Sequence, residues 1–115
     1  MPASSRVNTF RSIYTPDVVH SQPGHNQTSG EHTGVDDVLA LYGKLAELSG
    51  GTVAVDLRSV TPRGDKVVAV HHTTAVRAGK TLDVDETIEF TFTGHKISRL
   101  DLVAADQAAE DAFWG

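Results

Sequence analysis

The chain has 115 residues, a net charge of −5 and no cysteine. That length is enough for a substantial hydrophobic core, so we expect a single domain over residues 1–115. Basic residues are scattered, which argues against a nucleic-acid partner, because such proteins usually present a basic face. No apolar run approaches the roughly 20 residues of a membrane span, and the lack of cysteine excludes disulfides and thiol chemistry. No apolar segment follows the first residues as in a secretory signal, so we expect a cytoplasmic protein.

The first half of the chain predicts two helices with a short strand and a loop between them. Apolar residues at helical spacing predict a short helix over Val7–Tyr14, which a following proline ends. Asp17–His20 is typical of a short strand, and Ser21–Gly34 carries glycines and a proline without periodicity, which predicts a loop. Val35–Ser49 combines an apolar stripe, an acidic first turn and two terminating glycines, and therefore predicts a long helix.

The second half of the chain predicts strands joined by tight turns. Two strands, Thr52–Val60 and Lys96–Val103, flank a central hairpin in which Val67–Arg77 and Thr81–Phe92 enclose a short turn that contains glycine. A terminal helix follows, with Asp106 as a plausible N-cap. Because the helices are segregated from an antiparallel run of strands, the pattern indicates an α+β fold.

Five segments of the chain are together similar to one known family. They are Asp17-Val18-Val19-His20, Gly30-Glu31-His32-Thr33-Gly34, Arg77-Ala78-Gly79-Lys80-Thr81-Leu82-Asp83, Gly94-His95-Lys96-Ile97 and Asp106-Gln107-Ala108-Ala109-Glu110-Asp111-Ala112-Phe113-Trp114. Their order and spacing resemble the SnoaL-like, polyketide cyclase-like branch of the nuclear-transport-factor-2-like superfamily.

This resemblance implies a cone-shaped, cystatin-like fold, in which a strongly curved antiparallel sheet wraps around helices and encloses a pocket. It also implies a homodimer formed through the sheet. Characterised relatives include polyketide cyclases, ketosteroid isomerase and limonene epoxide hydrolase, while some members only bind ligands. Relatives usually open with a long helix ahead of the position of Val7–Tyr14. Almost nothing precedes Val7 in this sequence, so we expect a shortened N-terminal helix.

One residue breaks the alternation of apolar and polar side chains in Thr81–Phe92. Glu86 falls on the apolar face, among Val84, Ile88 and Phe90. Burying an unpartnered carboxylate is costly, so two interpretations remain open. Glu86 is either a general acid or base whose pKa burial raises, or a structural partner of an arginine or histidine.

Three further residues are candidates for catalysis. His71 and His72 are neighbours on a predicted strand and face opposite sides of the sheet, so one of them is expected to line the pocket. A histidine can pass a proton or hydrogen-bond a ligand carbonyl, although either residue could instead be satisfied within the sheet or at a dimer interface. The resemblance implies a catalytic aspartate on the closing strand, where Asp101 lies, but strand alternation also fits a solvated residue on the outer face.

Six residues are candidates for contacting a ligand. They are His20, Tyr14, Tyr42, Ile88, Phe90 and Trp114. The resemblance implies that His20 lies at the pocket mouth, whereas aromatic residues on apolar faces are mostly core. The 6 histidines show no helical metal-binding spacing and no cysteine accompanies them, so we expect no metal. No nucleotide-binding motif or nucleophile elbow is present, and we expect no cofactor.

Two functions are compatible with these observations. The first is a cofactor-free cyclase, isomerase or hydrolase, in which Glu86 or Asp101 is the base and a histidine donates a hydrogen bond to a small apolar carbonyl compound. The second is a dimeric module that binds a small apolar ligand without chemistry. The two differ in whether at least two polar groups converge inside one pocket.

Overall fold

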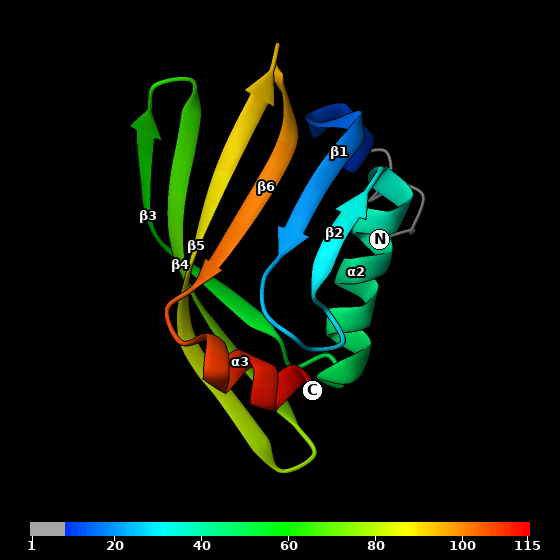
Figure 1. Cartoon of the computed structure of the whole chain (residues 1–115), viewed down its shortest axis with the longest axis vertical. Helices are drawn as coiled ribbons and strands as arrows, with labels where there is room; N and C mark the ends of the chain where they lie inside the picture. The colour runs from blue at the N-terminus through cyan, green and yellow to red at the C-terminus, as the bar shows by residue number, and fades with distance from the viewer. Residues whose placement is uncertain (1–8) are drawn as a thin grey trace.

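The computed structural model describes residues 9–115, and these form one curved sheet with helices on one side of it (Figure 1). Along the chain the elements are β1 (Tyr14–Gln22), β2 (Gly30–Thr33), α2 (Val35–Leu48), β3 (Ala54–Arg63), β4 (Lys66–Arg77), β5 (Lys80–Thr93), β6 (Lys96–Ala104) and α3 (Gln107–Trp114). The expected α+β class with a curved, unclosed sheet is confirmed. No helix of the described residues is long and apolar enough to cross a bilayer.

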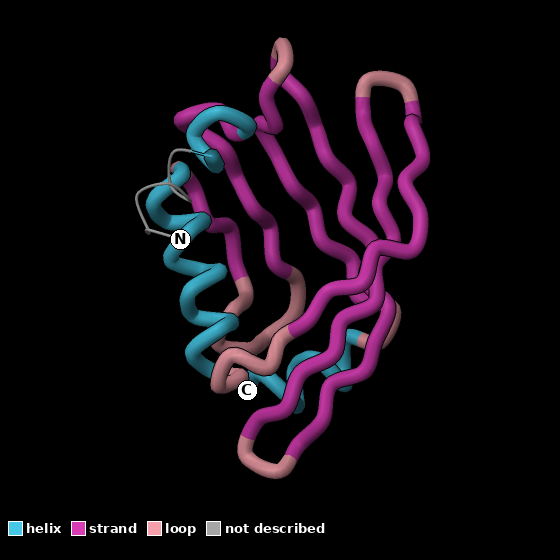
Figure 2. The backbone as a smooth tube through the Cα atoms, turned by 180° about the vertical axis from the view of Figure 1, so that it is seen from behind, coloured by secondary structure: helices cyan, strands magenta, loops and turns pink. Residues whose placement is uncertain are grey.

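The sheet has 6 strands in the order β2-β1-β6-β5-β4-β3. Strands β3 to β6 form the predicted antiparallel series, with the β3–β4 and β5–β6 turns at one end and the β4–β5 turn at the other (Figure 2). The pair β1–β6 is parallel, so the sheet is mixed. A parallel pair needs a long connection, and here α2 and strands β2 to β5 lie between the two strands in the sequence.

The N-terminal part differs from the sequence expectation in three ways. The predicted strand Asp17–His20 is the middle of the longer β1, which contains Pro16 at an irregularity in its pairing with β6, where no ladder hydrogen bond is lost. The predicted loop Ser21–Gly34 contains β2, which is too short and too polar to show a strand period. Of the predicted helix Val7–Tyr14, residues 9–13 are helical, Tyr14 begins β1, and the first residues lie outside the described part.

We call the side of the sheet that faces α2 its inner face and the opposite side its outer face. Two buried clusters occupy the inner face, one of Tyr14, Val18, Val35, Val38 and Leu100, and one of Ala75, Leu82, Val84, Phe113 and Trp114. Because the first cluster joins α2 to β1 and β6, the predicted packing of the long helix on the inner, concave face holds. A cavity that neither cluster fills remains on the inner face between them.

Helix α3 is capped at its N-terminal end and held to the sheet at its C-terminal end. The side chain of Asp106 accepts a hydrogen bond from the backbone N–H of Ala109 at 3.1 Å, so Asp106 is the predicted N-cap. At the other end Arg77 donates to the carbonyl of Phe113 at 3.0 Å, and Lys80 donates to that of Ala112 at 2.8 Å. Cations at a helix C-terminus stabilise its unpaired carbonyls.

We expect Leu82→Ala to lower the free energy of unfolding by about 2–5 kcal/mol, because deleting a buried leucine leaves a cavity. Leu82 is 1% exposed, whereas Val76 on the outer face is 50% exposed. The matched control Val76→Ala should cost less than about 1 kcal/mol. Urea unfolding monitored by the fluorescence of Trp114, the only tryptophan, measures both. Equal losses would contradict this assignment of the inner face.

Candidate functional site

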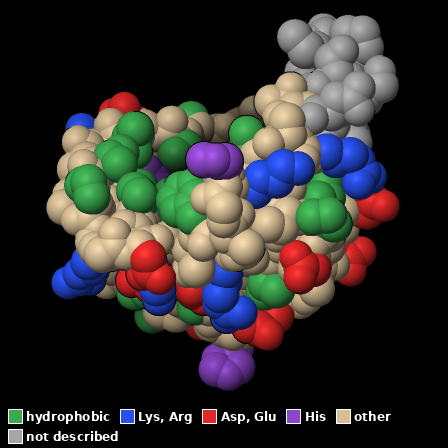
Figure 3. Space-filling view, turned by 90° about the horizontal axis from the view of Figure 1, so that it is seen from above, with side chains coloured by type: hydrophobic (Ala, Val, Ile, Leu, Met, Phe, Trp, Pro, Cys, Tyr) green, Lys and Arg blue, Asp and Glu red, His purple; other side chains and the backbone are tan. Residues whose placement is uncertain are grey.

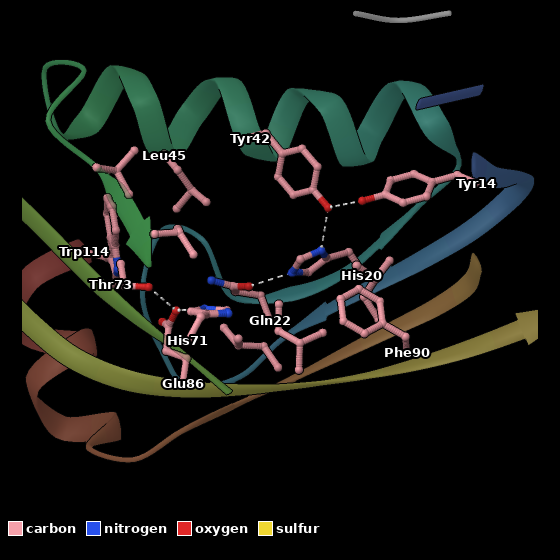
Figure 4. A pocket seen from close by; sticks show the side chains of 15 residues that line it. Tyr14, His20, Gln22, Tyr42, Leu45, His71, Thr73, Glu86, Phe90 and Trp114 are labelled. Atoms are coloured by element: carbon pink, nitrogen blue, oxygen red, sulfur yellow. Dashed lines mark hydrogen bonds and ion pairs between the residues drawn. The ribbon is translucent and has the colours of Figure 1, made fainter. Parts of the chain in front are cut away.

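A cavity of about 320 Å³ lies between α2, the inner face of the sheet and the end of α3 (Figure 4). Its lining is mostly apolar and comes from residues far apart in sequence. The lining residues are Tyr14, His20, Gln22, Tyr42, Leu45, Val53, Val55, His71, Thr73, Glu86, Ile88, Phe90, Leu100, Leu102 and Trp114. The polar members fall into two groups, which begin at opposite ends of the cavity, with Gln22 of the second group between those ends (Figure 4).

The first group, which we call the Glu86 cluster, consists of Glu86, His71 and Thr73. Strand pairing places His71 directly opposite Glu86 on β4 and β5, and both are buried on the inner face. Oε1 of Glu86 accepts from Nε2 of His71 at 2.7 Å and from the hydroxyl of Thr73 at 2.7 Å. Cross-strand neighbours on one face lie within this reach, so the hairpin register alone brings the pair together.

Glu86 is ionised although it is buried. Burial by itself raises the pKa of Glu86, but hydrogen bonds from His71, Glu110 and Thr73 favour the charged form and together lower that pKa to about 2. Of the two interpretations left open by the sequence, the partnered carboxylate is therefore the one observed. Because the carboxylate accepts from Nε2, that nitrogen of His71 carries a proton. The only side-chain hydrogen bond of His71 to the described residues uses Nε2, so Nδ1 is free to face a ligand.

The second group, the His20 network, consists of Tyr14, Tyr42, His20 and Gln22. The hydroxyls of Tyr14 and Tyr42 are 2.9 Å apart, and the Tyr42 hydroxyl is 3.1 Å from Nδ1 of His20. Nε2 of His20 lies 3.0 Å from Oε1 of Gln22. Strand β1 presents His20 and Gln22 on the same face, because side chains two apart in a strand point the same way.

The His20 network is neutral and runs in one direction. Burial lowers the pKa of His20, which the bond to Gln22 only partly offsets, so the ring is uncharged. The carbonyl oxygen of Gln22 can only accept, so His20 donates through Nε2 and accepts from Tyr42 through Nδ1. Tyr42 in turn accepts from Tyr14, whose hydroxyl begins the chain. Burial is also the main reason that the pKa values of Tyr14 and Tyr42 are raised, which keeps both hydroxyls protonated.

The structure brings together eight of the ten residues predicted from sequence. Those that line the cavity are Glu86, His71, His20, Tyr14, Tyr42, Ile88, Phe90 and Trp114. Of the two adjacent histidines, it is His71 that faces inward.

Two of the candidates for catalysis, His72 and Asp101, lie on the outer face and not in the cavity. His72 lies on the outer face, where Nδ1 contacts Asp85 at 2.7 Å and Nε2 contacts Asp83. Asp101 also points outward, between the inward-facing Leu100 and Leu102, and its carboxylate accepts from Arg99 at 3.0 Å. Since strand side chains alternate, neither residue can reach a ligand on the inner face.

Sequence reasoning missed three polar residues of the site. Thr73 lies two residues after His71 within a predicted strand, so the period of two would have found it. Gln22 lies two residues after His20 on the same face of β1, but the sequence predicted a loop there, so strand alternation gave no signal. Glu110 lies outside the cavity lining but contacts Glu86 from α3. Glu110 precedes Phe113 and Trp114 by three and four residues, so all three lie on one face of the helix. This spacing could have indicated from the sequence that Glu110 faces the core.

A sequence profile described as the SnoaL-like domain matches residues 3–100. The chain belongs to the SnoaL-like family. An uncharacterized protein of Mycobacterium tuberculosis is 41% identical over 102 residues, which are 88% of this chain and 78% of that protein. The family resemblance drawn from the sequence is thus confirmed.

Two solved structures of similar proteins have the same fold as this SnoaL-like chain. A protein of unknown function with a cystatin-like fold from Xanthomonas campestris is 35% identical, with a TM-score of 0.88 over 97% of this chain and 88% of that one. Bal32a, from a soil-derived mobile gene cassette, is 29% identical, with a TM-score of 0.91 over 97% of this chain and 86% of that one.

We expect the charge on Glu86 to make the protein lose stability in acid. The folded-state pKa is lowered from 4.5 to about 2, so the unfolded chain binds the proton more readily. The stability that the charge of Glu86 contributes is present above the pKa of the unfolded state. It is lost as the pH falls through the pKa of the folded state.

Thermal unfolding of the wild type and Glu86→Gln between pH 5 and pH 2 measures this loss. The melting temperature of the wild type should fall more steeply toward pH 2, because the glutamine variant has no carboxylate to protonate. The control Glu89→Gln, on the outer face, should keep the wild-type slope. Parallel curves for wild type and Glu86→Gln would contradict the ionised assignment.

Proposed function

We propose that this protein is a cofactor-free enzyme that moves a proton on a small, mainly apolar carbonyl compound. The observation that carries the proposal is the 2.7 Å hydrogen bond between Nε2 of His71 and Oε1 of Glu86, within a cavity that both residues line. A carboxylate that holds a histidine by one nitrogen leaves the other nitrogen as a base in a fixed orientation. Two polar groups thus converge inside one pocket, as the enzyme hypothesis requires.

His71 is the general base in this proposal. Its Nδ1 lone pair takes a proton from a carbon next to the substrate carbonyl, so a C–H bond breaks, an N–H bond forms, and the electron pair moves to the carbonyl oxygen as an enolate. Glu86 stabilises the resulting imidazolium. In a substrate with a carbon–carbon double bond next to the deprotonated carbon, return of the proton to the far end of the dienolate completes an isomerisation. In a substrate with a second carbonyl, attack of the enolate carbon on that carbonyl closes a ring, and the imidazolium of His71 returns its proton to the alkoxide that forms. Deprotonation of water by the same nitrogen would serve a hydrolysis.

The tyrosine hydroxyls are the proposed donors to the developing negative charge on oxygen. His20 was one of the histidines considered for this role, but both of its ring nitrogens are engaged, by Tyr42 and Gln22. Among the described residues, the hydroxyl of Tyr14 bonds only to that of Tyr42, so it can turn toward a substrate oxygen without leaving a buried nitrogen unpaired. A preorganised hydroxyl in a largely apolar site is a strong stabiliser of an oxyanion.

The shape of the cavity favours a ligand that extends toward β3. The cavity volume is at the lower end of the roughly 300–1,000 Å³ typical of small-molecule pockets. Strand β3 is exposed throughout, and Val55 and Leu57, paired with Thr73 and His71, lie on its inner face at 62% and 60% exposure. Figure 3 shows apolar side chains gathered on the β3 side of the molecule. An apolar compound that covers them would gain from their burial.

We expect the protein to exchange α-hydrogens of simple ketones in deuterated water. Acetophenone and cyclohexanone are suitable probes, and proton NMR follows the loss of the α-hydrogen signal. His71→Gln and Glu86→Gln should each slow the exchange by about 10²–10⁴-fold, because a positioned general base contributes this much. The matched control His72→Gln, on the outer face, should exchange at the wild-type rate.

Two outcomes of this experiment would overturn the enzyme proposal. If His72→Gln and His71→Gln lose equal activity, the base is not the inward-facing histidine. If NMR line broadening shows that the ketones bind in the cavity but no exchange occurs, the alternative holds, and the protein is a binding module for a small apolar ligand.

We also propose that the protein forms a homodimer through the outer face of the sheet, as the family resemblance implies. Two apolar side chains are exposed there, Val103 at 62% and Val76 at 50%. Exposed apolar side chains on a strand face are typical of an interface.

Light scattering at micromolar concentration should give twice the mass of the chain, and Val103→Glu should shift it toward the monomer, because it places a charge in the interface. The control Ile13→Glu changes an exposed apolar residue at the start of the described chain and should leave the dimer intact. A wild-type monomer at this concentration would contradict the proposal.

A further inference from the structure

The mechanism above leaves one buried ionisable group without a role. Glu110 is 3% exposed on the inward face of α3. Its Oε2 is buried, and no donor among the described residues reaches it. A buried carboxyl group without such partners is costly as an anion.

The side chain of Glu110 is hydrogen-bonded to that of Glu86. Two carboxyl groups in contact cannot both be ionised at moderate cost, so one of them keeps a proton. Glu86 accepts from His71 and Thr73 at 2.7 Å each, whereas Glu110 has no comparable donors. The charge therefore stays on Glu86 and the proton on Glu110, which makes Glu110 the donor of the hydrogen bond that joins them.

The surroundings of Glu110 act in the same direction. Burial is the largest cause that raises its pKa, to about 9, followed by the contact with Glu86 and by the charges of Asp111 and Asp106 on its own helix. On the sheet side, the titratable groups that face Glu110 are Glu86 and His71, which is hydrogen-bonded to Glu86. No positive side chain is among the causes of its shift.

We propose that Glu110 is a positioning residue, whose neutral carboxyl group donates a hydrogen bond to Glu86 and so keeps Glu86 an oriented carboxylate beneath His71. The proposal rests on the proposed function in one respect, namely that the orientation of His71 serves proton transfer. Glu110 does not line the cavity, and its effect on a substrate passes through Glu86 and His71.

The rest of α3 holds Glu110 in place for this task. The carboxylate of Asp111 accepts from the backbone N–H of His25 at 3.0 Å and from the side chain of Asn26 at 2.8 Å. The loop after β1 is thereby tied to α3, in addition to the N-cap and the cations at the C-terminal end. Because α3 is held both by this loop and by Arg77 and Lys80, the Glu110 acid meets Glu86 in one geometry, and the Glu86 carboxylate has donors that oppose its rotation.

The first measurement is the pH dependence of stability of wild type and Glu110→Gln. The folded-state pKa of Glu110 is raised from 4.5 to about 9. The stability that Glu110 contributes is therefore fully present below the pKa of the unfolded state and is lost as the pH rises through the pKa of the folded state. Glutamine keeps an N–H donor for Glu86 but cannot ionise. The variant should therefore melt at a higher temperature than wild type, by a margin that widens from pH 5 to pH 9. A constant margin would overturn the proposal.

The second measurement is a carbon-13 NMR titration of the side-chain carboxyl groups, which requires no substrate. In the wild type, Glu110 should be protonated at pH 7 and Glu86 ionised. Glu110→Met has nearly the same size but no donor, so the midpoint of Glu86 should move upward, while Glu110→Gln should restore it toward wild type. A merely space-filling role would give the same Glu86 midpoint in both variants. That result, or a Glu110 midpoint in the ordinary carboxyl range, would overturn the proposal.

The ketone exchange assay separates this proposal from the proposed function. If both hold, Glu110→Met should lower the maximal exchange rate by at least about 10-fold with little change in half-saturation, and Glu110→Gln should recover most of it. If the wild type exchanges no ketone but the titrations behave as expected, the proposed function fails and Glu110 still fixes the charge of Glu86. If Glu110→Met exchanges at the wild-type rate, the positioning role fails and the function stands.

Discussion

The site depends on keeping one carboxylate charged in an apolar half of the sheet. An ion moved into the interior loses several kcal/mol of solvation unless hydrogen bonds replace it. For Glu86 the replacement comes from His71 and Thr73 on the neighbouring strand and from Glu110 on α3. The first two are consequences of the β4–β5 register, because residues opposite one another on the same face are within reach. The same hydrogen bonds fix which nitrogen of His71 carries a proton, so the stabilisation of the buried charge and the orientation of His71 have one origin.

The cavity has different electrostatic characters at its two ends. The end near α3 holds an ionised group, whereas the end near β1 holds the neutral hydrogen-bonded series from Tyr14 to Gln22. The remaining lining, which includes Ile88 and Phe90, is mostly apolar. A further charge in such a lining would be poorly solvated unless a hydrogen-bonding group replaced its water. The cavity is therefore better suited to an uncharged ligand than to a charged one.

Much of the fold follows from local patterns in the sequence. The period of two in Thr81–Phe92 and the period of 3.6 in Val35–Ser49 both depend on neighbours a few residues apart, so the central hairpin and α2 were predictable. The same period placed Glu86 on the inner face. Strand β2 was not predictable, because its four residues are polar and it forms only by pairing with β1. The outward direction of Asp101 was one of two alternatives that the sequence left open, since the register of β6 against its neighbours was not known.

The sequence by itself therefore determined most of the helices and strands, the family of the chain, and the position of one carboxylate on an apolar strand face. Only the tertiary structure decided what that carboxylate meets. His71 rather than His72 points inward because β4 pairs with β5 in one register, and a slip by one residue would exchange them. Glu110 reaches Glu86 because α3 folds back onto the sheet. His20 reaches Tyr42 because α2 crosses the inner face of the sheet. Local periodicity fixes the direction of a side chain relative to its own strand or helix, whereas its partner depends on how distant segments pack.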